Sequence, residues 1–275
     1  MDDKPLDEQV LHQVDRGVSW ITLNRPEAHN AINPDQRNRV IQLLEQASED
    51  LDVRAVVLTA TGRSFCTGAD LRGARPGTAP RPTGAPDRAV GDVARLLRGG
   101  AQRLVAAVLD CEKPVIGAVN GTAAGIGAHL AFACDLVLAA ESARFVELFV
   151  RRALVPDGGG AYLLPRLIGP QRAKELLFFG DALSAVDAAE LGLVNRVVAD
   201  DELHEAAATW AGRLADGPTR AIALTKWLVN RSLETDRAGA FADEAMAQDL
   251  NMATADAQEG VAAFIERRDP EYRGW

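Results

Sequence analysis

One carboxylate stands where this chain could move a proton bound to carbon. Asp157 follows the apolar stretch Leu154-Val155-Pro156 and precedes three consecutive glycines, Gly158 to Gly160. Apolar neighbours remove water from a carboxyl group and raise its pKa, which suits a general base that takes a proton from carbon. The alternative is a structural role, because aspartate often caps helices and a helix is expected to begin near Ala161. The local pattern leaves both roles open.

Two glycine-containing segments could hold a developing oxyanion with backbone N–H groups. The segment Gly125–Leu130 lies between an expected strand and an expected helix, and Cys66–Leu71 follows another strand. Unpaired N–H groups at such positions attract negative charge, and two of them can stabilise the enolate of a thioester. The first segment could also be only a tight strand–helix turn. A nicotinamide site is disfavoured, because Leu130 replaces the third glycine of the dinucleotide fingerprint.

Three further polar residues have two possible roles each. Asp70 is expected to cap nearby backbone rather than to act as a base. His129, on the helix after the glycine turn, is either a neutral structural histidine or a polar wall or proton carrier near a thioester. Glu147, between Val146 and Leu148, is either a surface carboxylate or a second acid/base group.

Composition limits the class of protein. The chain has 275 residues, 47% hydrophobic and 25% charged, which is typical of a soluble globular protein. Its net charge of −9 argues against nucleic-acid binding. The three cysteines lack metal-ligand spacing, so we expect no metal site and free thiols in a cytoplasmic protein. The polar first residues and the absence of a long apolar run predict neither a signal peptide nor a membrane span.

Strands and helices are expected to alternate up to about residue 200, which predicts an α/β fold with a mainly parallel, layered core. After that point we expect helices only, packed on the core or on neighbouring subunits. We therefore divide the chain into a core, 1–199, and a helical region, 200–275. The proline-, glycine- and arginine-rich segment 72–91 is expected to be a mobile loop. The expected strands cover 10–23 (a pair), 54–60, 114–119 and 135–139, and the expected helices 34–50, 92–109, 127–133, 202–215, 218–233, 238–252 and 258–266.

Four segments together resemble the enoyl-CoA hydratase/isomerase (crotonase) family over nearly the whole chain. They are Ile21–Pro26 with Asn30-Ala31, Phe65–Leu71, Lys113–Gly121 with Ala124–Gly127, and Asp181–Val197. The resemblance implies a spiral of repeated ββα turns followed by a helical C-terminal trimerisation region. It implies an acyl-CoA substrate, no cofactor beyond the coenzyme A of that substrate, and a homotrimer or a dimer of trimers.

The same resemblance assigns roles to particular residues. The backbone N–H groups of Ala69 and of Ile126, next to Gly125, would be the oxyanion donors. The segment Thr67 to Leu71, including Asp70, would line the adenine pocket. Contacts to the phosphates of coenzyme A would come from Arg25, His29 and Arg273. Independently of the resemblance, the arginines of the predicted loop, Arg72 and Arg75, suggest further contacts to these phosphates.

Departures from the family pattern favour an isomerase. The two glutamates of the family's hydratases fall here on His129 and Phe149, which cannot perform the usual paired-carboxylate chemistry on water. Asp157 stands where some isomerases carry an aspartate, and Ala143–Arg166 is especially similar to the ring-epoxide isomerases of bacterial phenylacetate breakdown. We therefore expect Asp157 to move the proton and His129 and Phe149 to line the substrate site. Two alternatives remain: a hydratase in which His129 or Glu147 replaces a glutamate, and an inert acyl-CoA-binding protein.

Overall fold

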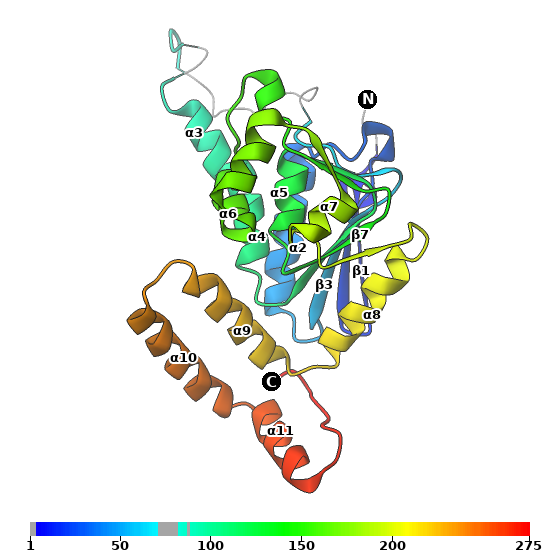
Figure 1. Ribbon diagram of the computed structural model, residues 1–275, viewed down its shortest axis with the longest axis vertical. Helices are drawn as coiled ribbons and strands as arrows, with labels where there is room; N and C mark the ends of the chain where they lie inside the picture. The colour runs from blue at the N-terminus through cyan, green and yellow to red at the C-terminus, as the bar shows by residue number, and fades with distance from the viewer. Residues whose placement is uncertain (1–3, 71–81, 87–88) are drawn as a thin grey trace.

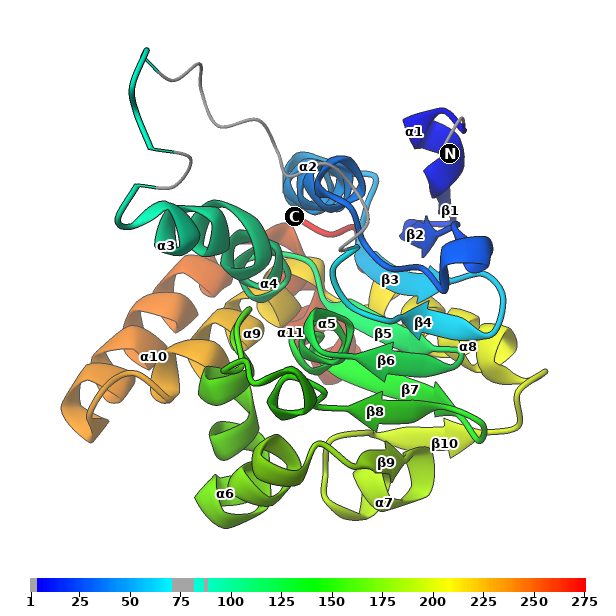
Figure 2. The same ribbon diagram turned by 90° about the horizontal axis from the view of Figure 1, so that it is seen from above.

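The computed structural model describes residues 4–70, 82–86 and 89–275. Its strands form two sheets that lie next to each other (Figure 2). The larger sheet has the order β1-β2-β3-β5-β7-β10, and the smaller has the order β4-β6-β8-β9. The strands of the larger sheet are β1 Val10–Asp15, β2 Val18–Leu23, β3 Ala55–Ala60, β5 Val115–Val119, β7 Leu136–Ala140 and β10 Arg196–Val198. Those of the smaller sheet are β4 Ser64–Cys66, β6 Thr122–Ala124, β8 Arg144–Val146 and β9 Ala182–Ser184.

The chain visits the two sheets in turn, which confirms the predicted spiral of ββα units. Strand β3 is followed by β4, β5 by β6, and β7 by β8, so each turn adds one strand to each sheet. The neighbours β2, β3, β5, β7 and β10 pair in parallel, as do β4, β6 and β8. Only the first pair, β1 with β2, and the last, β8 with β9, are antiparallel among the described strands. Parallel strands place their carboxyl ends at one edge, and the loops that leave this edge form the site described below.

The helices surround these sheets (Figure 1). Helix α5 is buried along its whole length and contacts β4, β5 and β6 as well as α4 and α6. Its glycine and alanine residues allow this close packing from all sides. The helices before the C-terminal region are α1 Leu6–Gln9, α2 Pro34–Glu49, α3 Asp92–Leu97, α4 Arg103–Leu109, α5 Ile126–Phe132, α6 Gly160–Phe179 and α7 Ala185–Glu190.

The predicted helix over 92–109 is present but not uniform. A wide turn, η2 Arg98–Gln102, separates α3 from α4 at a pair of glycines. The three-residue strands of the smaller sheet were not predicted, because strands this short carry no alternation of polar and apolar residues. Most of the predicted mobile loop, including Arg72 and Arg75, lies outside the described residues.

Four helices complete the chain: α8 Leu203–Ala215, α9 Thr219–Ser232, α10 Arg237–Met252 and α11 Ala255–Glu266. Helix α8 packs against β3, β5 and β7, and its His204 ring lies 4.7 Å from the ring of Trp20. The other three extend beyond the sheets (Figure 1). Helix α9 is attached to the core by Lys226, whose Nζ lies 2.8 Å from Asp135 Oδ2 and donates to the carbonyl of Val108. The predicted division of the chain near residue 200 stays a prediction.

No helix within the described part of the chain is long and apolar enough to cross a membrane.

Candidate active site

The two predicted oxyanion donors lie on adjacent loops. Ala69 follows β4 and bridges in parallel to Ile32, and Ile126 begins α5 two residues after β6. Because β4 and β6 are parallel neighbours, both loops leave the same edge of the smaller sheet. Neither the Ala69 N–H nor the Ile126 N–H has an acceptor among the residues that the structure describes. Both groups are therefore able to donate to a ligand.

Glycines let these two loops touch through their backbones. A Cβ atom at Gly127 would lie 2.0 Å from the carbonyl oxygen of Cys66, so no side chain fits at this position. Gly125, just before α5, has φ 54° and ψ −123°, a conformation that residues with a side chain rarely adopt. The glycines of the sequence segment thus fix the start of α5 against the end of β4.

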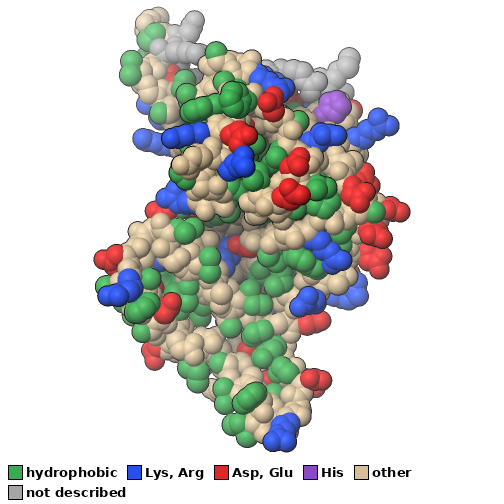
Figure 3. Space-filling model, in the orientation of Figure 1, with side chains coloured by type: hydrophobic (Ala, Val, Ile, Leu, Met, Phe, Trp, Pro, Cys, Tyr) green, Lys and Arg blue, Asp and Glu red, His purple; other side chains and the backbone are tan. Residues whose placement is uncertain are grey.

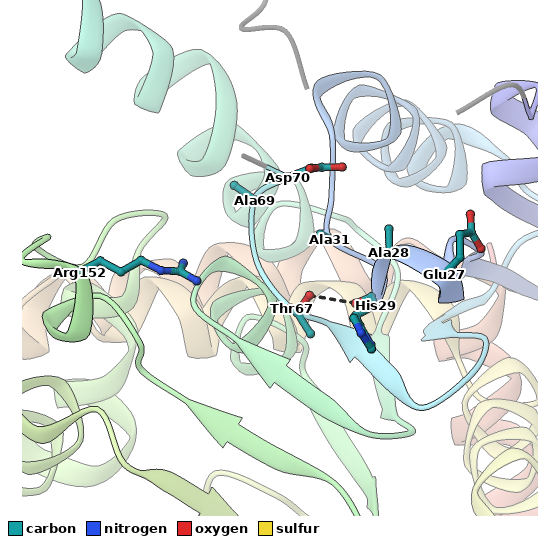
Figure 4. A pocket seen from close by; sticks show the side chains of 8 residues that line it. All are labelled: Glu27, Ala28, His29, Ala31, Thr67, Ala69, Asp70 and Arg152. Carbon is teal, nitrogen blue, oxygen red and sulfur yellow. Dashed lines mark hydrogen bonds between the residues drawn. The ribbon is translucent and has the colours of Figure 1, made fainter. Parts of the chain in front are cut away.

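A pocket of about 370 Å³ opens beside these loops (Figure 4). It brings together four residues that were predicted to contact coenzyme A: His29, Thr67, Ala69 and Asp70. The hydroxyl of Thr67 donates to the carbonyl of His29 over 3.1 Å, which connects the loop after β4 to the loop after β2. The other lining residues are Glu27, Ala28, Ala31 and Arg152.

Sequence reasoning missed Arg152. It ends the short helix η3, Val150–Arg152, and its side chain extends toward Thr67 and His29 in Figure 4. The adjacent pair Arg151-Arg152, directly after the apolar Phe149 and Val150, was the available signal.

Arg25 was predicted to contact the phosphates of coenzyme A directly. This prediction is wrong for a side chain that is buried, as the Arg25 side chain is. Arg25 is only 1% exposed, and it does not line the pocket. Its guanidinium donates to the carbonyl of Ala31 and to Gln36, and lies 3.0 Å from the carboxylate of Asp70. Arg25 therefore holds the pocket-lining Ala31 and Asp70 in place. Asp70 was predicted only to cap nearby backbone, and its buried ion pair with Arg25 was not predicted.

Arg273 does not reach the pocket of its own chain. The backbone of neighbouring Tyr272 accepts a hydrogen bond from Arg54, which directly precedes β3. The C-terminal segment thus lies at the amino end of the parallel strands, whereas the pocket lies beyond their carboxyl ends. The predicted phosphate contact from Arg273 is wrong within one chain. The predicted contact from Leu71 falls outside the described residues.

His129 and Glu147 form a buried pair. Nε2 of His129 lies 2.9 Å from Oε2 of Glu147, and the two side chains are 0% and 4% exposed. The surface role considered for Glu147 is therefore wrong. The phenyl ring of Phe149 stacks on the imidazole, with the ring centroids 5.4 Å apart and the planes 10° apart. The same phenyl ring lies beside Gly125, at the start of the Ile126 loop.

Asp157 lies half-buried next to this pair. The segment that follows Asp157 rests on α5: a Cβ at Gly158 would lie 2.3 Å from Cδ1 of Ile126, and one at Gly160 would lie 2.2 Å from Nε2 of His129. Burial raises the pKa of the Asp157 carboxyl, His129 opposes this effect, and the negative charge of Glu147 adds to it. The helix-capping role is wrong, because α6 has Gly159 at its N-cap and no side-chain cap. A carboxyl group with this environment suits proton transfer at carbon.

No cluster of three or more potential metal ligands occurs in the described ranges of the chain.

Known proteins share this fold. The enoyl-CoA hydratase/isomerase family profile matches residues 13–274, and the chain belongs to that family. It is 41% identical over 269 residues to the 1,2-epoxyphenylacetyl-CoA isomerase of Escherichia coli K12, covering 97% of this chain and 99% of the relative. It is 34% identical to the crotonyl-CoA hydratase of Syntrophomonas wolfei, covering 96% and 98%. The crystal structure of an enoyl-CoA hydratase from Mycobacterium smegmatis superposes with a TM-score of 0.86 at 36% identity, covering 98% of this chain and 99% of that one.

These similarities confirm the predicted family and fold class. The chain is an acyl-CoA enzyme of the enoyl-CoA hydratase/isomerase type. Its relatives carry both isomerase and hydratase names, so the choice between the two reactions depends on the side chains of the site.

Proposed function

We propose that this chain is an enoyl-CoA isomerase. Asp157 takes a proton from a carbon next to the thioester, or conjugated with it through the double bond, and returns it to another carbon, which shifts the double bond. The N–H groups of Ala69 and Ile126 donate to the thioester oxygen while it carries the negative charge of the enolate. One such donor contributes on the order of 3 kcal/mol to the stability of an oxyanion transition state.

The observation that carries this proposal is the position of Asp157. Its carboxyl is half-buried and has a raised pKa, and the next residue, Gly158, packs against the side chain of Ile126. A raised pKa makes a carboxylate a stronger base, and one base is enough to move a proton between two carbons on one face of a substrate. The thioester acidifies the carbon, so this reaction requires no metal or redox cofactor.

The hydratase alternative is less well supported by the same residues. Hydration needs two groups that hold a water molecule and exchange protons with it. His129 and Glu147 are hydrogen-bonded to each other and buried, and Phe149 places an apolar ring where the second acid/base group would be needed. The apolar ring of Phe149 also favours an isomerase, because an enolate kept from water is less readily diverted.

The pocket in Figure 4 supports an acyl-CoA as the ligand. Arg152 and His29 can meet the phosphates of coenzyme A, and the backbone around Thr67 can contact the adenine. The relative named 1,2-epoxyphenylacetyl-CoA isomerase supports the isomerase class and makes ring-bearing acyl groups worth testing beside linear ones.

A homotrimer, or a dimer of trimers, is the assembly that we propose. Helices α9 to α11 carry exposed large apolar side chains that a partner subunit would cover: Trp227, Phe241, Met246, Leu250, Phe264 and Ile265. In a trimer, Arg273 of one chain could serve the site of a neighbour. The proposed location is the cytoplasm, in keeping with three buried free cysteines.

The products formed by the wild-type protein test the proposed reaction. Linear 2-enoyl-CoA and 3-enoyl-CoA esters, and 1,2-epoxyphenylacetyl-CoA, are incubated with the protein and separated by chromatography. We expect interconversion of double-bond positions, or conversion of the epoxide, with little 3-hydroxyacyl-CoA. Mainly 3-hydroxyacyl-CoA would establish the hydratase instead. Binding of the esters without any product, and without exchange of substrate protons with deuterated water, would establish the inert binding protein.

A further inference from the structure

The buried pair of His129 and Glu147 has no part in the reaction proposed above. Only one hydrogen bond, of 2.9 Å, joins the two side chains. Nδ1 of the histidine and Oε1 of the glutamate are buried and have no hydrogen-bond partner among the described residues. Burying two such groups with half of their hydrogen-bonding capacity unused is costly, so packing alone gives little reason for them.

Three elements fix the orientation of the histidine ring. His129 lies on the fully buried helix α5, and Glu147 holds its Nε2 edge from the end of β8. Phe149 lies parallel to the ring, 5.4 Å away. Gly160 touches the ring where any side chain would collide with Nε2 and Cε1. The imidazole is thus held by a carboxylate, a phenyl ring and a stretch of backbone.

This stretch of backbone is part of the turn that begins at Asp157. The N–H of Gly160 donates to the carbonyl of Asp157 over 3.3 Å, so the turn that carries the carboxylate rests directly on the His129 ring. On its other side, α4 and η2 meet this turn with Val105 and Ala101, which carry no charge. Among the described residues, His129 and Glu147 are the titratable neighbours that act on the pKa of the Asp157 carboxyl: the histidine lowers it and the glutamate raises it.

We propose that His129 and Glu147 act together as positioning residues for Asp157. Glu147 accepts the Nε2–H of His129 and orients the ring, and the histidine end of the pair faces the Asp157 turn. The His129 ring supports this turn and favours the ionised form of the Asp157 carboxylate, which is the form that can accept a proton from carbon. This inference rests on the proposed role of Asp157 as the base. Neither member of the pair exchanges a proton with the substrate.

The test is the pH dependence of kcat/KM for isomerisation in Glu147→Gln, which keeps the size of the side chain. Activity falls at low pH as Asp157 becomes protonated, so the midpoint of this acid limb reports its pKa. Glu147→Gln removes a negative charge that raises the pKa of the Asp157 carboxyl. We therefore expect the midpoint to move downward, and kcat on the high-pH plateau to fall by up to about tenfold because the ring loses the carboxylate that orients it.

A second variant and a control separate positioning from stability. His129→Asn removes the group that lowers the pKa of Asp157, so it should move the acid limb upward, and it serves as the test if Glu147→Gln does not fold. Asp135→Asn breaks a partly buried ion pair, with Lys226, remote from the pocket. It should lower Tm and leave the acid limb in place.

An unmoved acid limb in the folded variants, with only a lower Tm, would overturn the inference. Failure of the proposed function has a different signature, which is retained turnover in Asp157→Asn. The two ideas can therefore fail separately.

Discussion

At the scale of single residues, the environment of Asp157 determines when the enzyme can work. The carboxyl must be ionised to accept a proton, and its pKa lies above the ordinary value of 3.8 because the group is half-buried. Activity should therefore be complete above that raised pKa and fall as the pH drops through it. We predict an acid limb of kcat/KM with its midpoint above 3.8, measured on a 3-enoyl-CoA ester. A midpoint at or below the ordinary value would contradict the assigned base.

Arg152 provides a second test at this scale. Its exposed guanidinium lines the pocket, so it should attract the phosphates of coenzyme A. Arg152→Ala should raise KM by about fivefold, corresponding to about 1 kcal/mol for an exposed ion pair. The increase in KM should shrink in high salt, and kcat should change little.

The neighbouring Arg151 is a matched control, because it pairs with Asp181 and does not line the pocket. Steady-state kinetics of Arg151→Ala should resemble those of the wild type. Equal effects of the two substitutions, at low and high salt alike, would remove Arg152 from the binding site.

The roles of several residues could not be predicted from the sequence. Glu147 looks like a surface carboxylate in its local pattern, and its burial depends on His129, which lies 18 positions earlier in the chain. Arg25 looks like a free cation for the same reason, since its partner Asp70 is 45 positions away. Local sequence patterns describe neighbours along the chain, whereas the charge of a buried side chain is matched by neighbours in space.

At the scale of elements, the strand–turn–helix segments were predictable and the smaller sheet was not. The buried strand β5 is apolar throughout and β3 is apolar except for Thr59, and α2 begins with the capping pair Asn33 and Gln36, so local chemistry indicates each of them. The three-residue strands β4 and β6 have no such pattern. They are strands because they pair in parallel with each other, and this pairing brings the loops of Ala69 and Ile126 to the same edge of the sheet.

Contact between the loops after β4 and β6 can be tested at Gly127. Gly127→Ala places a methyl group within 2.0 Å of the Cys66 carbonyl, so one of the two loops must shift. We predict a loss of about 1–3 kcal/mol in the free energy of unfolding, as for other overpacked sites. The displaced N–H donors should also lower kcat more than they change KM.

Gly212 on α8 offers the control, because a Cβ there meets no atom within 4 Å. Turnover of Gly212→Ala should match the wild type, and its free energy of unfolding should be equal or higher by up to about 1 kcal/mol, because alanine favours a helix over glycine. A Gly127→Ala protein that keeps full kcat would show that the two loops do not need this spacing.

At the scale of the whole molecule, the C-terminal helices leave an apolar surface uncovered in a single chain. Phe264 is 84% exposed and Ile265 is 72% exposed, near the end of α11. The view in Figure 3 shows further hydrophobic side chains on the helices below the sheets. Apolar surfaces of this kind usually mark an interface between proteins.

We predict a mass in light scattering of three or six times the 29.3 kDa of the chain. Phe264→Glu should shift the distribution toward the monomer, because the charge would be buried without a partner in the interface. Leu51→Glu, at an exposed apolar residue outside these helices, should leave the assembly unchanged. A wild-type protein that stays monomeric at high concentration would rule out the proposed trimer.

The central claim is that Asp157 is the base of an enoyl-CoA isomerase, and one measurement tests it most directly. Wild type and Asp157→Asn are incubated with a 3-enoyl-CoA ester in deuterated water, and both deuterium uptake and product are followed by mass spectrometry. Asparagine keeps the shape of the side chain and cannot accept the proton. We predict that the variant binds the ester with wild-type affinity while exchange and isomerisation are lost, by a factor of at least about 1,000. Exchange and turnover close to the wild type in Asp157→Asn would contradict the assignment.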